Sequence, residues 1–146
     1  PNGSRHRYDA MMSGMVEATT LTEPYLTLAE KNGCRVVASA FYHGTEVASD
    51  KIDAETYSKF NSAVCEAVYR INANKKKYLQ YFIDYHKEKD PEIGTLNVSD
   101  LQESRIVVVE PAPIPEDELE RTANWIKSWG MLSTTENHSD LVNRIM

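Results

Sequence analysis

The stretch VEATTLTEPYLTLAEKNG, Val16–Gly33, constrains the fold most, because it changes within a few residues from a strand-like pattern to a helical one. Its first part alternates and carries β-branched side chains, which favours a short strand over Val16–Leu21. Thr22 can then cap a helix whose first turn holds a carboxylate and a proline, and an Asn-Gly pair is a typical helix end. The stretch predicts a strand that leads directly into an amphipathic helix.

Three further segments have the composition of strands. They are CRVVASA (34–40), GTEVAS (44–49) and RIVVVE (105–110), of which the last is either a strand or an extended segment. The aromatic loop Phe41-Tyr42-His43-Gly44 joins the first two. Together with the helix before them, these segments predict an α/β fold in which strands are flanked by helices.

Helical patterns dominate the second half of the chain. Asp53 is a good N-cap, and apolar residues then recur at spacings of three and four for about five turns. A second helix follows the NAN turn, a third runs from about Pro115 to Trp129 and stops at Gly130, and a short one is expected over Asp140–Ile145. We therefore divide the chain into a tail (1–10), an α/β segment (11–50) and a helical segment of the same fold (51–146).

Composition narrows the class of partner. A net charge of -6 and a pI near 5.2 give no overall attraction to phosphates, so nucleic acid is not an expected partner. The start of the chain lacks the apolar core of a secretory signal, and no apolar run is long enough to cross a bilayer. We expect both Cys34 and Cys65 to be buried thiols, although their spacing leaves open whether they pair.

The familiar catalytic and metal-binding motifs are absent from the sequence. It contains no Gly-rich phosphate loop, no Cys-x-x-Cys, no His-Glu-x-x-His and no Gly-x-Ser-x-Gly. The four histidines are far apart, and His43 is the best candidate because it lies in a loop between two predicted strands. We therefore predict no catalytic residue, no metal site and no cofactor.

Polar and aromatic residues gather where the predicted strands end. Loops at strand ends are where α/β proteins bind small molecules, and a mixture of hydroxyls and aromatic faces suits a small organic ligand. Each of these residues could instead have a structural role, and Glu23 in particular could simply stabilise its own helix. The candidate ligand-binding residues are Thr19, Thr20, Thr22, Glu23, Tyr25, Tyr42 and His43.

The order of these motifs resembles the NMT1/THI5-like, or SsuA-like, solute-binding proteins of ABC importers. In that family a Gly-x-Val-Asp-Ala strand leads to a Glu-Pro helix and then to a second strand. The matching positions here are Gly14, Val16, Ala18, Glu23 and Pro24, with Glu17 in place of the usual aspartate. The return strand, the long helix from residue 53, the helix after NAN and ELERTANWIKSWGML also follow the family order.

The resemblance implies part of a periplasmic-binding-protein type II fold with a helix-rich C-terminal half. Members of the family are about twice this length, so the chain resembles their second half only. The implied function is capture of a small polar organic ligand, containing nitrogen or sulfur, for ABC-type import. Two alternatives stay open: a thiamine- or pyrimidine-biosynthesis enzyme of the same fold, whose cysteine-rich motif is absent here, and an interaction domain without a small ligand.

The partners implied by the resemblance are a small-molecule ligand and an ABC permease. The missing N-terminal half would come from the same protein, from a second chain or from a domain-swapped dimer. The compartment is periplasmic or extracytoplasmic for a bacterial importer component and cytoplasmic for a fungal-type relative.

Overall fold

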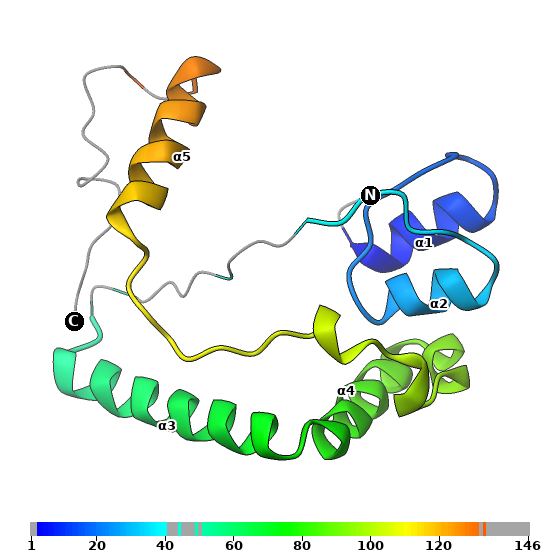
Figure 1. Ribbon diagram of the computed structural model, residues 1–146, viewed down its shortest axis with the longest axis horizontal. Coiled ribbons are helices and arrows are strands. Elements are labelled where there is room, and N and C mark those ends of the chain that lie inside the picture. Colours follow the sequence, from blue (N-terminus) through cyan, green and yellow to red (C-terminus); the bar gives the residue numbers. More distant parts are fainter. Residues whose placement is uncertain (1–2, 41–43, 45–48, 50, 132, 134–146) are drawn as a thin grey trace. The chain divides into compact units, whose positions relative to one another are not determined.

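The computed structural model describes residues 3–40, 44, 49, 51–131 and 133, and all regular secondary structure within them is helical (Figure 1). The elements, in chain order, are α1 (Ser4–Met12), α2 (Tyr25–Lys31), α3 (Ala54–Ala73), α4 (Lys75–Lys89), the 3-10 helices η1 (Pro91–Thr95), η2 (Val98–Asp100) and η3 (Glu103–Arg105), and α5 (Glu116–Ser128).

The predicted α/β class, and with it the periplasmic-binding-protein type II fold, is wrong for this structure. The described residues contain no strand and no sheet. The segments 16–21, 34–40 and 106–110 form neither helix nor strand, since a strand needs a neighbouring strand to hydrogen bond with. Here Val16 N–H donates to Ala10 O, and Cys34 N–H donates to Ala29 O, so both segments are tied to helix ends. Most of the predicted strand at 44–49 lies outside the described residues.

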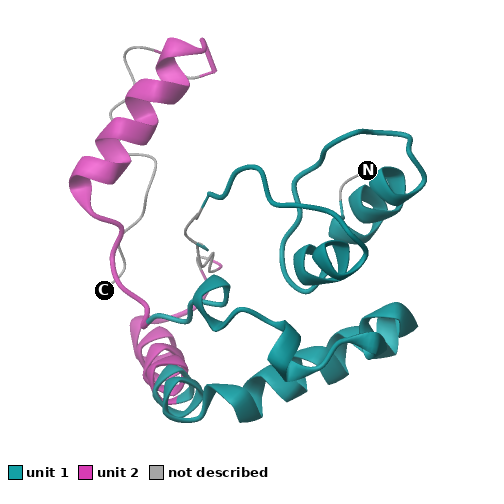
Figure 2. Cartoon of the chain, turned by 45° about the vertical axis from the view of Figure 1, so that its right-hand side comes forward, with its two compact units in different colours: residues 1–46, 67–109 teal, residues 47–66, 110–146 magenta. Residues whose placement is uncertain are grey.

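The chain forms two compact units, shown in different colours in Figure 2. Unit 1 consists of residues 1–46 and 67–109, and unit 2 consists of residues 47–66 and 110–146. Helix α3 contributes its first part to unit 2 and its last part to unit 1. Unit 1 therefore contains α1, α2, α4 and the three 3-10 helices, whereas unit 2 contains α5.

The hydrophobic core of unit 1 joins helices that are distant in sequence. Helices α1 and α2 pack together, and α4 packs against η1 and η2. Leu28 from α2, Ile83 from α4 and Ile93 from η1 are almost completely buried. The core cluster consists of Tyr8, Leu28, Ala29, Leu79, Ile83, Ile93, Leu96 and Leu101. These contacts hold α2 against α4 and thereby position the polar side chains described below.

Several helix boundaries predicted from local signals are confirmed. Asp53 accepts a hydrogen bond from Thr56 N at 2.7 Å and caps α3, and Asn74 accepts one from Lys77 N at 3.3 Å and caps α4. Gly33 and Gly130, which follow α2 and α5, have φ values of 88° and 69°, a left-handed conformation that glycine adopts without strain. Helix α1, by contrast, begins at Ser4 inside the predicted tail.

Both tryptophans of the chain lie at helix α5 in unit 2. Trp125 lies on it, and Trp129 is its C-terminal cap, with ring centroids 5.5 Å apart. Both side chains are exposed, and Ala123 is the buried residue of the helix. Acidic residues occupy the first turn, where they stabilise the positive end of the helix dipole. Among the described residues, no helix is long and apolar enough to cross a bilayer.

Candidate functional site

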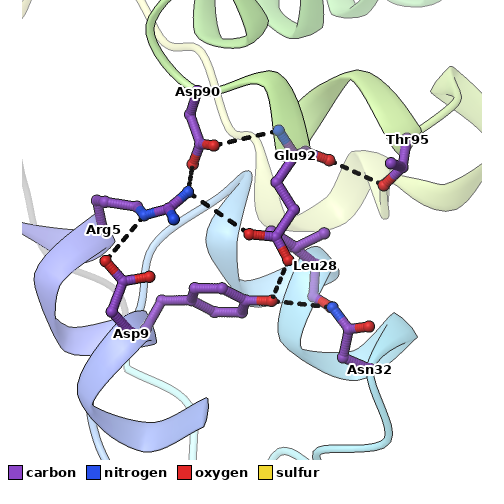
Figure 3. A network of polar contacts seen from close by, with 8 residues as sticks. Arg5, Asp9, Leu28, Asn32, Asp90, Glu92 and Thr95 are labelled. Atoms are coloured by element: carbon purple, nitrogen blue, oxygen red, sulfur yellow. Dashed lines mark hydrogen bonds and ion pairs between the residues drawn. The ribbon is translucent and has the colours of Figure 1, made fainter. Parts of the chain in front are cut away.

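A cluster of charged side chains joins α1 to the end of α4 in unit 1 (Figure 3). This Arg5 cluster consists of Arg5, Asp9, Asp90 and Glu92. The Arg5 Nε lies 2.9 Å from Asp9 Oδ2, while its Nη1 donates to Asp90 Oδ2 and lies 3.5 Å from Glu92 Oε2. Asp90 is the buried member, with a side chain only 7% exposed. One guanidinium thus neutralises carboxylates from two segments that are distant in sequence.

Tyr8 extends this cluster to α2. Its hydroxyl donates to Glu92 Oε1 at 3.0 Å and accepts from Asn32 Nδ2 at 2.9 Å. Asn32 Nδ2 also donates to the carbonyl of Leu28 at 3.1 Å. Burial and the hydrogen bond to Glu92 raise the pKa of Tyr8 to about 12. The phenol therefore stays neutral near pH 7 and acts as a hydrogen-bonding bridge.

Asp90 is held in its ionised form. Burial by itself raises the pKa of this carboxyl, but hydrogen bonds from Arg5 and Tyr25 outweigh it and leave the pKa below its ordinary value. The same carboxylate accepts Glu92 N–H at 3.2 Å and so caps η1. Burial, followed by the hydrogen bond to Asp90, raises the pKa of Tyr25.

A second charged group, the Arg105 cluster, consists of Glu23, Glu30 and Arg105. Arg105 binds Glu30 through two nitrogens, with Nη1–Oε2 at 2.5 Å and Nη2–Oε1 at 3.1 Å. This bidentate pair lowers the pKa of Glu30. Glu23 Oε1 lies 3.5 Å from Arg105 Nη1, and its Oε2 accepts Thr27 N–H at 3.1 Å. The cluster ties η3 to α2.

Two buried oxygens beside α2 lack a hydrogen-bond donor or acceptor within the described structure. They are Thr27 Oγ1 and Glu23 Oε1, although the latter has Arg105 as an ion-pair neighbour. Thr27 is only 4% exposed. An unpaired buried hydroxyl lowers the free energy of unfolding by about 1–3 kcal/mol, so the Thr27 hydroxyl destabilises this interior.

The two clusters stabilise the fold, and their side chains have few polar groups left to bind a ligand or take part in a reaction. Their carboxylates are held by guanidinium groups, and Tyr8 already donates and accepts. No group of three or more potential ligand side chains that could hold a metal ion occurs in the part of the chain that the structure describes. His86 packs edge-on against Phe82, with ring centroids 4.6 Å apart, and burial lowers its pKa.

The predicted binding residues fall into three groups. Glu23 and Tyr25 belong to the interior polar contacts described above. Thr20 and Thr22 lie at the surface, where the Thr20 carbonyl accepts from Arg7 Nε at 2.7 Å and the Thr22 and Ser4 hydroxyls are 2.9 Å apart. Thr19 is half-buried beside them. The predictions for Tyr42 and His43 fall outside the described residues. The structure thus brings Thr20 and Thr22 together beside α1.

Sequence reasoning missed the residues that organise both clusters. Arg5 lies in the predicted tail and Asp90 in a predicted loop, yet they pair across 85 positions. Arg105 and Glu30 pair across 75 positions. The only local signal was Asp90-Pro91, because an aspartate before a proline is a common start for a short helical turn.

Comparison with known proteins gives no relative for this chain. No protein-family model, no curated protein and no solved structure matches it.

Proposed function

We propose that this chain belongs to a solute-binding protein of an ABC importer and contributes to binding a small polar organic ligand that contains nitrogen or sulfur. The order of the sequence motifs supports the proposal, since a Glu-Pro turn, a long helix, a helix after NAN and a late helix ending at glycine follow one another as in that family. Helix α2 follows the Glu-Pro turn, and α3, α4 and α5 are the α-helices that come after it.

The main support for the proposal is the polar surface formed by Thr19, Thr20 and Thr22 beside α1. Thr20 and Thr22 are exposed, and the hydroxyls of Thr19 and Thr20 make no hydrogen bond within the described residues. They can therefore donate to or accept from a ligand. Arg7 lies against this surface through its bond to the Thr20 carbonyl.

The chemistry of this surface favours a ligand with an anionic group. Arg7 uses Nε for the Thr20 carbonyl and Nη2 for the Ser4 hydroxyl, at 3.2 Å. Its positive charge remains beside the threonine hydroxyls, and a guanidinium can bind a carboxylate or sulfonate through parallel hydrogen bonds. An amino acid or an organic sulfonate combines such a group with a small polar body.

A two-dimensional NMR titration of the isotope-labelled chain tests the proposal, because chemical shifts report even millimolar binding. Amino acids, sulfonates, pyrimidines and polyamines are added in turn. We expect at least one class to shift the amide signals of residues 19–23 in a saturable manner. Thr20→Val should weaken that binding, since it removes a hydroxyl and keeps the side-chain shape. Thr122→Val, an exposed threonine on α5, is the matched control and should bind normally.

A second candidate, an interaction domain without a small ligand, is favoured by the exposed Trp125 and Trp129. Large aromatic side chains on one helix are common in protein interfaces. An absence of saturable shifts for every solute class would contradict solute binding by this surface and would favour the interaction domain.

A further inference from the structure

Two extended segments of the chain have exposed backbone edges. Among the described residues, the backbone of residues 35–40 makes no hydrogen bond, and neither does that of Val107 or Val109. Three of their valine side chains are exposed, Val37 to 76%, Val107 to 61% and Val109 to 68%, whereas Val36 and Val108 are half-buried. An extended, β-branched segment with unpaired N–H and C=O groups is a template for pairing with another chain.

The segment around Val108 presents one particular edge. Asn72 Nδ2 donates to the Val108 carbonyl at 3.1 Å, so this residue faces its own chain. In an extended segment, neighbouring residues direct their backbone groups to opposite sides. Val107 and Val109 therefore direct theirs away from Asn72. The free edge of this segment is defined by these two valines.

The two segments carry complementary charges. Arg35 lies near the start of 34–40, and Glu110 ends 106–110. Both residues are exposed and have no ion-pair partner in the described part of the chain. An antiparallel arrangement that places Arg35 opposite Glu110 also places Val36 opposite Val109 and Val37 opposite Val108. One register thus places opposite charges across from each other and valine across from valine. Opposite charges across an antiparallel pair are favourable.

We propose that two copies of this chain associate by antiparallel pairing of the segment 34–40 of one copy with the segment 106–110 of the other. Pairing in both directions gives a closed twofold dimer with two such contacts. The backbone hydrogen bonds run through Val107 and Val109, and Arg35 of one copy lies opposite Glu110 of the other. The inference is independent of solute binding, since it uses none of the threonines beside α1.

Disulfide trapping tests the pairing directly. In a Cys34→Ser/Cys65→Ser background, Val37→Cys and Val108→Cys are made in separate proteins, one of which carries a mass tag. These positions form a non-hydrogen-bonded pair, where Cα atoms are about 4.5 Å apart and a disulfide can form. Mild oxidation of the mixture should give mainly the mixed dimer. Ala38→Cys with Val108→Cys, which is shifted by one residue, is the matched control and should cross-link at least several-fold less.

Charge reversal gives a second, reversible measurement. Arg35→Glu should raise the dimer dissociation constant, measured by sedimentation, by roughly tenfold, because two unlike pairs become like pairs. The double variant Arg35→Glu/Glu110→Arg should restore the original value. Three results would each overturn the proposal: a monomer mass at every accessible concentration, equal cross-linking by the control pair, or no restoration by the double variant.

Discussion

The Arg5 guanidinium and the Asp90 carboxylate, 85 positions apart in the chain, form an ion pair whose acidic member is buried and whose basic member is partly exposed. This contact fixes the N-terminal helix to the end of α4. Because Asp90 also caps η1, one carboxylate stabilises two connections in unit 1.

Replacing Asp90 should destabilise unit 1 more than replacing the other carboxylates around Arg5. We expect Asp90→Asn to lower the free energy of unfolding by roughly 2 kcal/mol, which is less than the loss of a fully buried pair because Arg5 is 41% exposed. Urea denaturation followed by circular dichroism measures the effect. Asp9→Asn, at an exposed position of the same cluster, is the control and should change the value by less than about 0.5 kcal/mol. Equal effects would contradict the central role of Asp90.

Acid should destabilise the protein through Asp90 and Glu30. Both have a lower pKa in the folded protein than their ordinary value. Their stabilising effect is therefore present above the unfolded-state pKa of about 4 and is lost as the pH falls through the folded-state pKa. The free energy of unfolding should decrease from pH 5 downward, over about three pH units.

The double variant Asp90→Asn/Glu30→Gln is the control for this acid dependence. It should have a flatter profile of unfolding free energy against pH, measured by urea titrations at each pH. An unchanged slope would assign the acid sensitivity to other carboxylates.

Tyr8 should ionise only in strongly alkaline solution. Its pKa is raised from 10.0 to about 12, so the stability from its neutral hydroxyl is present below pH 10 and is lost between these two values. The difference between the ultraviolet absorbance titrations of the wild type and Tyr8→Phe isolates this transition. The variant should also lose about 1–2 kcal/mol, because Glu92 and Asn32 each lose a hydrogen-bond partner. Tyr69→Phe, at an exposed ring, should leave the stability unchanged.

Thr27→Val should be neutral or stabilising, in contrast to most buried substitutions. The Thr27 hydroxyl is buried without a partner, and valine replaces it with a methyl group of similar size. We expect a gain of up to about 1 kcal/mol in the free energy of unfolding. Thr95→Val is the matched control, because its hydroxyl donates to the Glu92 carbonyl at 2.8 Å and its loss should be destabilising. A loss of more than about 1 kcal/mol in Thr27→Val would instead indicate a bound partner for the hydroxyl.

Ile93→Ala tests whether η1 is part of the core. Ile93 is completely buried, so truncation should cost about 3 kcal/mol through lost burial and a residual cavity. Met15→Ala, at a side chain 79% exposed, should change the free energy of unfolding by less than about 0.5 kcal/mol. Similar values for the two variants, measured by urea denaturation, would argue against this core.

Local signals in the sequence predicted the starts of α3 and α4 and the end of α5, but they assigned the start of α1 to a tail and the cap of α2 to Thr22 instead of Pro24. Pairings across the chain were not predictable. Asp53 and Gly130 mark a helix start and a helix end because capping depends on a few neighbouring residues. The β-branched run at 106–110 suggested a strand for an equally local reason. Strand formation also requires a second segment at the right distance, and composition does not supply that information.

The candidate site shows the same division. Thr20 and Thr22 were singled out as polar residues at a boundary between elements, and they do lie together at the surface. The roles of Glu23 and Tyr25 depend on Arg105 and Asp90, which are brought to them by tertiary packing. The spacing of residues along the chain does not indicate such tertiary partners.

The location of both tryptophans at α5 gives the protein a built-in pair of optical reporters. Tryptophan emission follows unit 2 alone, whereas Tyr8 and Tyr25 lie in unit 1, whose described residues contain no tryptophan. Tryptophan fluorescence therefore reports on unit 2 alone, whereas far-ultraviolet circular dichroism reports on the helices of both units. Comparing the denaturation midpoints of the two signals shows whether the units unfold together. Coincident midpoints would mean that the two units unfold as one cooperative block, and separated midpoints would give each unit its own stability.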